Sequence, residues 1–291
     1  MIYTIENNFL TVQISSLGAE LYSIKSTDGT EYLWQGDTRY WGGRAPIMFP
    51  ICGRLFEGKY TYLGKEYEMG SHGIARHQEF SLKCQEKSKI TLSLVGNEET
   101  KKSYPFDFVF DVTFSLNDSS ILVEYKVTNT DSKDIIFGLG AHPAFNVPLE
   151  PDLAFEDYRV EFEKECDAFR VEFSPTCFCT RNDKLYLGKK TRTIDLKHNL
   201  FDNDAIFLYN TPKKITLLSS KGSKSVTLKF DNMKYIGLWH ATKKDAPYVC
   251  IEPWCSSPSD DGVIDDLMTK KEMVHLPANC MHKTKYEIII K

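Results

Sequence analysis

The sequence lacks the features that would place the protein in a membrane, outside the cell or on a nucleic acid. None of its apolar runs approaches the roughly 20 residues that a membrane-spanning helix needs, and no basic segment followed by an apolar one stands at the amino terminus. The formal net charge is -4, and the lysines and arginines gather only in short clusters, which argues against a nucleic-acid footprint. We therefore expect a cytoplasmic protein with no membrane and no nucleic acid among its partners.

The motifs of common cofactor and metal enzymes are also missing. There is no phosphate-binding loop, no glycine fingerprint for a dinucleotide and no Gly-x-Ser-x-Gly turn. No His-Glu-x-x-His or Cys-x-x-Cys pair occurs, and the spacing of His72 and His77 matches no standard zinc pattern. We therefore predict that the protein needs no cofactor and no metal ion. The eight cysteines are irregularly spaced, and we interpret them as reduced, mostly buried thiols.

What the sequence does contain is a repeated period of two. In residues 106–116 phenylalanine, valine and leucine alternate with other residues, mostly polar. Because successive side chains of a strand leave opposite faces, this pattern predicts a strand with an aromatic face on a core. A polar turn at residues 117–120 and a second alternating run at residues 121–127 complete a predicted hairpin.

Similar short strands are expected along the whole chain. Residues 31–34 are expected to follow a hairpin turn at Asp28-Gly29, and only residues 262–268 offer a window for one or two helical turns. Many short strands with evenly spaced turns predict an all-β sandwich or barrel, and we expect residues 1–291 to form a single domain. The other predicted strands are residues 10–14, 60–62, 66–68, 90–94, 215–218, 226–230 and 286–290.

Four stretches differ from ordinary strand or turn sequence because each puts a titratable or charged side chain beside glycine or proline. Those two residues fix unusual backbone geometry, and loops held by a rigid scaffold are where functional sites tend to lie. The stretches are Phe-Pro-Ile-Cys-Gly-Arg at 49–54, Gly-Ser-His-Gly-Ile-Ala-Arg-His at 70–77, Gly-Ala-His-Pro-Ala-Phe-Asn at 140–146 and Cys-Ile-Glu-Pro-Trp at 250–254.

Two of these stretches offer an acid and a base. His142 follows a run of small and apolar residues, and an imidazole at a strand end is a natural proton donor near neutral pH. Glu252 follows an apolar strand, where an unpaired carboxylate is costly to bury, so it is expected at a strand end facing a site or solvent. Pro253 is expected to end the ladder, and Trp254 offers a flat apolar face for a sugar. A structural histidine and a strand-end salt bridge are the simpler alternatives.

The segment that holds His72 and Arg76 is the third candidate. A guanidinium presents a planar fork of donors suited to hydroxyl, carboxylate or phosphate oxygens. The alternative interpretation is a surface turn with a solvated arginine.

Taken together and in this order, the four stretches resemble the aldose 1-epimerase (galactose mutarotase) family, and most closely its LacX-like branch. The resemblance implies a large antiparallel β-sandwich with a sugar bound in a cleft on one sheet. It implies that His142 is the general acid and Glu252 the general base. His72 is then expected to bind and polarise the sugar, and Arg54 to contact its hydroxyls.

The family also uses an aspartate before an apolar strand. Asp204 is the better candidate and Asp202 the alternative, and Ala205 stands where many members have histidine. Arg76 lies in a His-Gly-x-x-Arg form that also resembles the branch acting on hexose 6-phosphates, where Arg76, with Arg44, would clamp the phosphate.

The reaction implied by the resemblance is interconversion of the α and β anomers of an aldohexose such as galactose or glucose. One alternative is a hexose-6-phosphate 1-epimerase of the same fold. The other is a non-catalytic sugar-binding or sensing protein. The expected partner is a small-molecule sugar or its phosphate, and a homodimer is an open alternative to a monomer.

Overall fold

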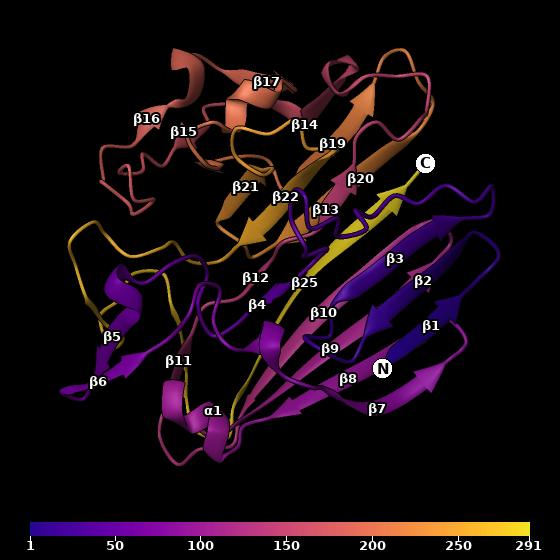
Figure 1. The fold of residues 1–291 in the computed structure, drawn as a ribbon. Helices are drawn as coiled ribbons and strands as arrows, with labels where there is room; N and C mark the ends of the chain where they lie inside the picture. Colours follow the sequence, from indigo (N-terminus) through magenta and orange to yellow (C-terminus); the bar gives the residue numbers. More distant parts are fainter.

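Two large antiparallel sheets carry most of the chain (Figure 1) in the computed structural model, which describes residues 1–291. The first sheet has nine strands, and its central strand in the spatial order is the last one in the sequence. In that order the strands are β17 (Thr191–Asp195), β14 (Tyr158–Cys166), β19 (Lys214–Ser219), β20 (Ser225–Asp231), β25 (Met281–Ile290), β10 (Ser120–Asn129), β9 (Phe108–Asn117), β8 (Lys89–Val95) and β7 (Ser81–Glu86).

The second sheet has eight strands, and it carries the candidate site. Its strand β22 (Tyr248–Trp254) lies between β21 (Tyr235–Trp239) on one side and two short strands, β12 (Gly140–Ala141) and β13 (Ala144–Asn146), on the other. The remaining strands are β16 (Lys184–Leu185), β15 (Phe169–Arg170) and β18 (Ile206–Tyr209) beyond β21, and β4 (Ile47–Met48) beyond β12.

Smaller elements flank these two sheets. One three-stranded sheet is formed by β1 (Ile2–Glu6), β2 (Leu10–Ser15) and β3 (Leu21–Ser26). A second one is formed by β5 (Lys59–Tyr62), β6 (Lys65–Glu68) and β23 (Asp265–Asp266), with β23 parallel to β5. A two-stranded sheet pairs β11 (Ile135–Phe137) with β24 (Val274–Leu276). The helices are α1 (Glu98–Ser103) and the 3-10 turns η1 (Phe56–Gly58), η2 (Ala75–His77), η3 (Phe155–Asp157), η4 (Tyr186–Gly188) and η5 (His198–Phe201). None of them is both long enough and apolar enough to cross a membrane.

The core lies between the two large sheets. Phe49, which follows β4 of the eight-stranded sheet, packs on Phe110 of β9 with 4.8 Å between ring centroids. One cluster of 68 buried hydrophobic residues extends from Ile5 to Ile290 and includes residues of both sheets. The predicted all-β sandwich is therefore confirmed. The prediction of one domain over residues 1–291 remains to be tested by limited proteolysis.

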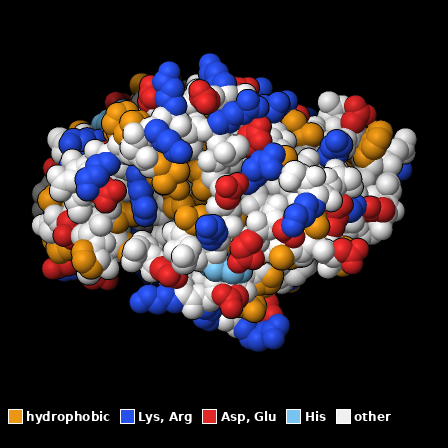
Figure 2. All heavy atoms as spheres, turned by 90° about the horizontal axis from the view of Figure 1, so that it is seen from above, with side chains coloured by type: hydrophobic (Ala, Val, Ile, Leu, Met, Phe, Trp, Pro, Cys, Tyr) orange, Lys and Arg blue, Asp and Glu red, His pale blue; other side chains and the backbone are white.

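The predicted hairpin is confirmed as the pair β9–β10, with Asn117 opposite Ser120 and the even-numbered residues of β9 buried. Charged side chains of both signs are interspersed over the face shown in Figure 2, as the near-neutral composition suggested. All eight cysteines are free thiols, as predicted, but the expectation that most of them are buried is wrong, because only three are buried and the other five are partly or fully exposed.

Two expected elements are absent, for local reasons. Residues 31–34 form only isolated bridges, because the backbone of Trp34 pairs with Ala144 instead of continuing along β3. Residues 262–268 form no helix, because Asp265 pairs with β5 while its carboxylate accepts hydrogen bonds from Ser259 and Lys270. The α-helix lies instead at α1, where the Asn97 side chain caps the first turn.

Candidate active site

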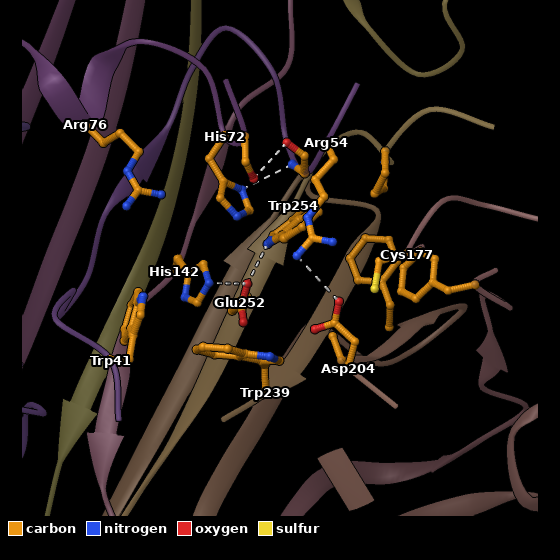
Figure 3. Close-up of a pocket in the computed structure, with 16 residues that line it drawn as sticks. Trp41, Arg54, His72, Arg76, His142, Cys177, Asp204, Trp239, Glu252 and Trp254 are labelled. Carbon is orange, nitrogen blue, oxygen red and sulfur yellow. Dashed lines mark hydrogen bonds and ion pairs between the residues drawn. The ribbon is translucent and has the colours of Figure 1, made fainter. Parts of the chain in front are cut away.

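The register of β22 with its neighbours brings two distant residues together. Gly140 of β12 lies opposite Trp254, and Ala144 of β13 lies opposite Cys250. Counting along both strands places His142, between β12 and β13, opposite Glu252. A histidine and a glutamate 110 positions apart in the sequence therefore meet at the same level of one sheet (Figure 3).

Glu252 lies inside β22 and not at its end, which corrects the expectation that Pro253 ends the ladder. Pro253 is paired opposite Ile236 of β21. On the other side, Ile251 N–H donates to the Pro143 carbonyl and Cys255 N–H donates to the Leu139 carbonyl. Because proline has no N–H, Pro253 cannot donate the hydrogen bond that would lie between these two, and this is the one bond that the ladder lacks here. The gap coincides with the break between β12 and β13 at which His142 projects.

The alternation of β22 explains which way the glutamate points. Val249 and Ile251 belong to the main core cluster between the sheets. Since side chains alternate along a strand, Cys250, Glu252 and Trp254 lie on the opposite face. That face is covered by the pocket residues, so all seven residues of β22 are buried.

His142 and Glu252 form a close, buried pair. The Nε2 atom of His142 lies 3.3 Å from Oε2 of Glu252, and the two residues are 7% and 2% exposed. Burial raises the pKa of Glu252 well above its usual range, and the charge of Asp204 adds to this. Burial also lowers the pKa of His142 well below its usual range, with His72 and Arg76 acting in the same direction. Both shifts disfavour charge, so the pair favours its neutral form, with one proton on the carboxyl group.

Aromatic rings fix the position of His142. Its imidazole stacks on Trp41 with 4.9 Å between ring centroids and meets the edge of Trp239 at 5.7 Å. Its Nδ1 atom is buried and has no hydrogen-bond partner. The ring is therefore held by packing, with its Nε2 side toward Glu252.

Trp254 lies in the pocket wall, as the sequence suggested, and it also contacts Glu252. Its indole N–H donates a hydrogen bond of 3.2 Å to Oε2 of Glu252. Its ring meets His72 edge-on at 5.4 Å and packs on Phe207 at 4.7 Å. Trp254 therefore orients the carboxylate, and its hydrogen bond favours the ionised form of Glu252 against the effect of burial.

His72 lies on the loop after β6, in a left-handed conformation with φ 65°. The backbone N–H of Gly53 donates to its Nδ1 at 3.2 Å, so the neutral ring carries its proton on Nε2. Burial lowers the pKa of His72 to about 3, with the charges of Arg76 and Arg54 contributing. His72 is therefore a neutral hydrogen-bond donor at the pocket wall.

Arg54 and Asp204 close the opposite side of the pocket. Their nearest side-chain nitrogen and oxygen are 4.0 Å apart, and both side chains are partly exposed. Asp204 lines the same pocket as Glu252, whereas Asp202 lines a neighbouring hollow. The structure therefore favours Asp204 over Asp202 as the site aspartate.

The two arginines considered for a phosphate differ in their surroundings. Arg76 lines the pocket, and burial lowers its pKa, an effect that Glu20 partly offsets. Arg44 instead donates to the Tyr22 carbonyl and to Gln35, and stacks on the Tyr22 ring at 3.5 Å. The suggestion that Arg44 clamps a phosphate together with Arg76 is therefore wrong. His77 lines a second hollow beyond Arg76.

All seven residues selected from the sequence line one pocket of about 300 Å³ (Figure 3). This volume is at the small end of ligand pockets, which range from about 300 to 1,000 Å³. Sequence analysis missed Trp41, Trp239, Phe207 and Cys177, which also line it. Trp41 precedes Gly42-Gly43, but the rule used for the other stretches selected only titratable or charged side chains and therefore passed over it. The selected residues are Arg54, His72, Arg76, His142, Asp204, Glu252 and Trp254.

Comparison with known proteins agrees with this geometry. The sequence model of the family described as aldose 1-epimerase matches residues 1–260. The chain is 35% identical to the plasmid-encoded protein LacX of Lactococcus lactis subsp. lactis over 301 aligned positions, covering 100% of this chain and 99% of LacX. The chromosomal LacX of the same organism is 34% identical, with the same coverage.

Solved structures show the same fold. The galactose mutarotase related enzyme from Lactobacillus acidophilus superposes with a TM-score of 0.94 at 34% identity, covering 100% of this chain and 97% of that one. The galactose mutarotase-like protein from Lactobacillus casei ATCC 334 gives a TM-score of 0.94 at 33% identity, with 100% of both chains covered. By sequence over its full described length and by fold, the chain belongs to the aldose 1-epimerase family.

Proposed function

We propose that this protein is a mutarotase that interconverts the α and β anomers of an aldohexose by acid–base opening and closing of the ring. Family membership supports an epimerase-type enzyme acting on a sugar. The observation that carries the proposal is the buried contact of 3.3 Å between His142 and Glu252 at the base of a monosaccharide-sized pocket. A reaction that moves one proton on and another off the sugar needs such a pair.

In the proposed reaction Glu252 takes the proton of the anomeric hydroxyl. The C1–O5 bond breaks as C1=O forms, and His142 gives its proton to O5. Rotation about C1–C2 then presents the other face of the aldehyde. Ring closure reverses both transfers, so the enzyme ends in the protonation state in which it began.

The proton balance of the pair fits this cycle. The ring-opening form has an ionised Glu252 and a protonated His142, and the ring-closing form has a protonated Glu252 and a neutral His142. In both forms the pair holds the same total number of protons, and only the position of one proton differs. The pKa directions favour the neutral form in the empty pocket, and proton transfer across the 3.3 Å contact links the two without exchange with solvent.

The other pocket residues can hold the ring in place. His72 presents an N–H donor, Arg54 and Asp204 present a donor and an acceptor on the far side, and the indoles of Trp41 and Trp239 present flat apolar faces. Groups positioned in this way favour one orientation of C1 and O5 relative to the acid–base pair.

Polarimetry of a freshly dissolved single anomer tests the proposal. The wild-type protein should accelerate mutarotation of glucose or galactose over the buffer rate, and His142→Asn should lose about 10²–10⁴-fold in turnover. His77→Asn, which alters an exposed histidine, is the matched control. Sugar binding without acceleration by the wild-type protein would instead indicate a non-catalytic binding or sensing protein.

One observation supports a hexose 6-phosphate as a second candidate substrate. The guanidinium of Arg76 lines the pocket, and the carboxylate of Glu20, which offsets its burial, already accepts backbone hydrogen bonds from Arg44 and Ala45. If the substrate is phosphorylated, Arg76→Gln should reduce kcat/KM on glucose 6-phosphate much more than on glucose. Equal reductions on both sugars would exclude this candidate.

A further inference from the structure

A third side chain lies beside the acid–base pair and takes no part in the proposed reaction. Cys250 shares the pocket-side face of β22 with Glu252, two residues away. Ligand atoms of His142, Cys250 and Glu252 all lie within 4.8 Å of one another, and all three residues are buried. A nitrogen, a sulfur and an oxygen donor are thus grouped beneath the sugar pocket.

We propose that these three residues form a binding site for a zinc-like divalent metal ion, and that the ion inhibits the enzyme by occupying its acid and its base. Imidazole, thiolate and carboxylate are the ligands that zinc takes in proteins. The site itself does not depend on the reaction, whereas the inhibition rests on the proposed function.

The distances suit a tetrahedral ion. Zinc–ligand bonds of about 2.0–2.3 Å put the ligand atoms of a tetrahedron about 3.3–3.8 Å apart. His142 Nε2 and Glu252 Oε2 are already 3.3 Å apart, and the 4.8 Å limit for the whole set requires only a small closing movement. His142 and Glu252 line the pocket, so the fourth position would face it and take a water molecule or a sugar hydroxyl.

Charge balance also favours a divalent ion. A thiolate and a carboxylate together carry the two negative charges that neutralise it, so the occupied site adds no net charge to a buried region. Binding releases two protons to solvent, one from the Cys250 thiol and one from the Glu252–His142 pair. The Nε2 atom of His142 already faces Glu252, so the ion would bind at this nitrogen while Nδ1 keeps the ring proton.

Cobalt(II) substitution tests the site without any variant. Metal-free wild-type protein titrated with Co²⁺ should bind one equivalent and show a sulfur-to-cobalt charge-transfer band in the near ultraviolet. A cobalt complex without that band would overturn the proposal, and so would a failure to bind Co²⁺ or Zn²⁺. This readout stands even if the protein shows no mutarotase activity, so its outcome is separate from that of the proposed function.

Cys250→Ala provides the second arm, with Cys179→Ala as the control because Cys179 is also buried. Loss of one ligand should weaken Zn²⁺ binding at least about 10–100-fold, while the control binds like the wild type. In polarimetry, Zn²⁺ should inhibit the wild-type enzyme, and a chelator should restore the activity. Cys250→Ala should keep the wild-type activity but should not be inhibited by Zn²⁺. Equal zinc affinity in Cys250→Ala and the wild type would refute the assignment.

Discussion

Glu252 and Asp111 are both buried carboxylates, 2% and 3% exposed, on interior strands of the two large sheets. Burial tends to raise the pKa of each. At Asp111 this effect is outweighed by hydrogen bonds from Lys126, Lys83 and Ser93, so its pKa is held below the usual range. Glu252 has a neutral imidazole and an indole N–H in place of lysines, and its pKa rises well above the usual range.

The difference shows that the partners of a buried carboxylate decide what it can do. The two lysines, each 2.8 Å from Asp111, hold it ionised and make it a structural link between three strands. Glu252 has no such cation beside it, so burial raises its pKa and favours the protonated form.

The largest expected effect is the loss of activity when Glu252 cannot ionise. Glu252→Gln keeps the shape and one acceptor but removes the base, so turnover in polarimetry should fall by about 10²–10⁴-fold. Asp111→Asn, the same chemical change on the other sheet, should leave turnover unchanged. If both variants behaved like the wild type, the assignment of Glu252 would be wrong.

Stability should show the opposite contrast. Asp111→Asn removes a charged acceptor from two lysines, and we expect the free energy of unfolding to fall by about 1.5–3 kcal/mol in urea denaturation at neutral pH. Asp118→Asn, in the exposed turn between β9 and β10, should change it by less than about 0.5 kcal/mol. An Asp111→Asn variant as stable as this control would contradict the structural role of the lysines.

A smaller effect is expected from the indole that orients Glu252. Trp254→Phe removes the 3.2 Å hydrogen bond to Oε2 and keeps most of the aromatic packing. A hydrogen bond to a charged group contributes about 1.5–3 kcal/mol, and we expect turnover to fall by about tenfold with little change in KM. A change confined to KM would instead indicate that Trp254 contacts the sugar.

The smallest effect is a difference in how stability depends on pH. The lowered pKa of Asp111 means that its contribution is present at neutral pH and is lost as the pH falls through its folded value, below the usual 3.8. The raised pKa of Glu252 acts in the other direction, because stability falls as the pH rises above the usual 4.5 toward its folded value.

Urea unfolding at about pH 4 and about pH 7 measures this difference. Glu252→Gln should be more stable than the wild type at the higher pH and should lose that advantage at the lower one. Glu79→Gln, at an exposed position, is the control. An equal gain at both pH values would show that Glu252 has an ordinary pKa.

Local patterns allowed much of the fold to be predicted. The hairpin β9–β10 follows from a period of two and a polar turn, because both depend on neighbouring residues. Residues 31–34 followed their local signal only in part: Glu31 and Tyr32 pair with β3, whereas the partners of Leu33 and Trp34 lie on β13, more than a hundred residues away. Sequence reasoning cannot see such a partner without knowing the sheet order.

The site was predictable as a set of residues but not as an arrangement. His142 and Glu252 were recognisable from their positions beside proline, and the pocket contains them both. Their mutual contact depends on the register of β22 with β12 and β13, and the orientation of Trp254 toward Glu252 depends on the same register. Arg44 was considered because of its charge, but a carbonyl, an amide and a tyrosine ring nearby engage it.

The place of β25 in the nine-stranded sheet has a consequence for synthesis on the ribosome. Residues 281–290 fill the slot between β20 and β10, so a nascent chain that stops short of them has two open strand edges where the finished protein has none. Such edges invite pairing with other chains. Removal of these ten residues should therefore yield aggregates rather than a smaller folded enzyme. The two halves of the nine-stranded sheet can join only after residues 281–290 have been translated.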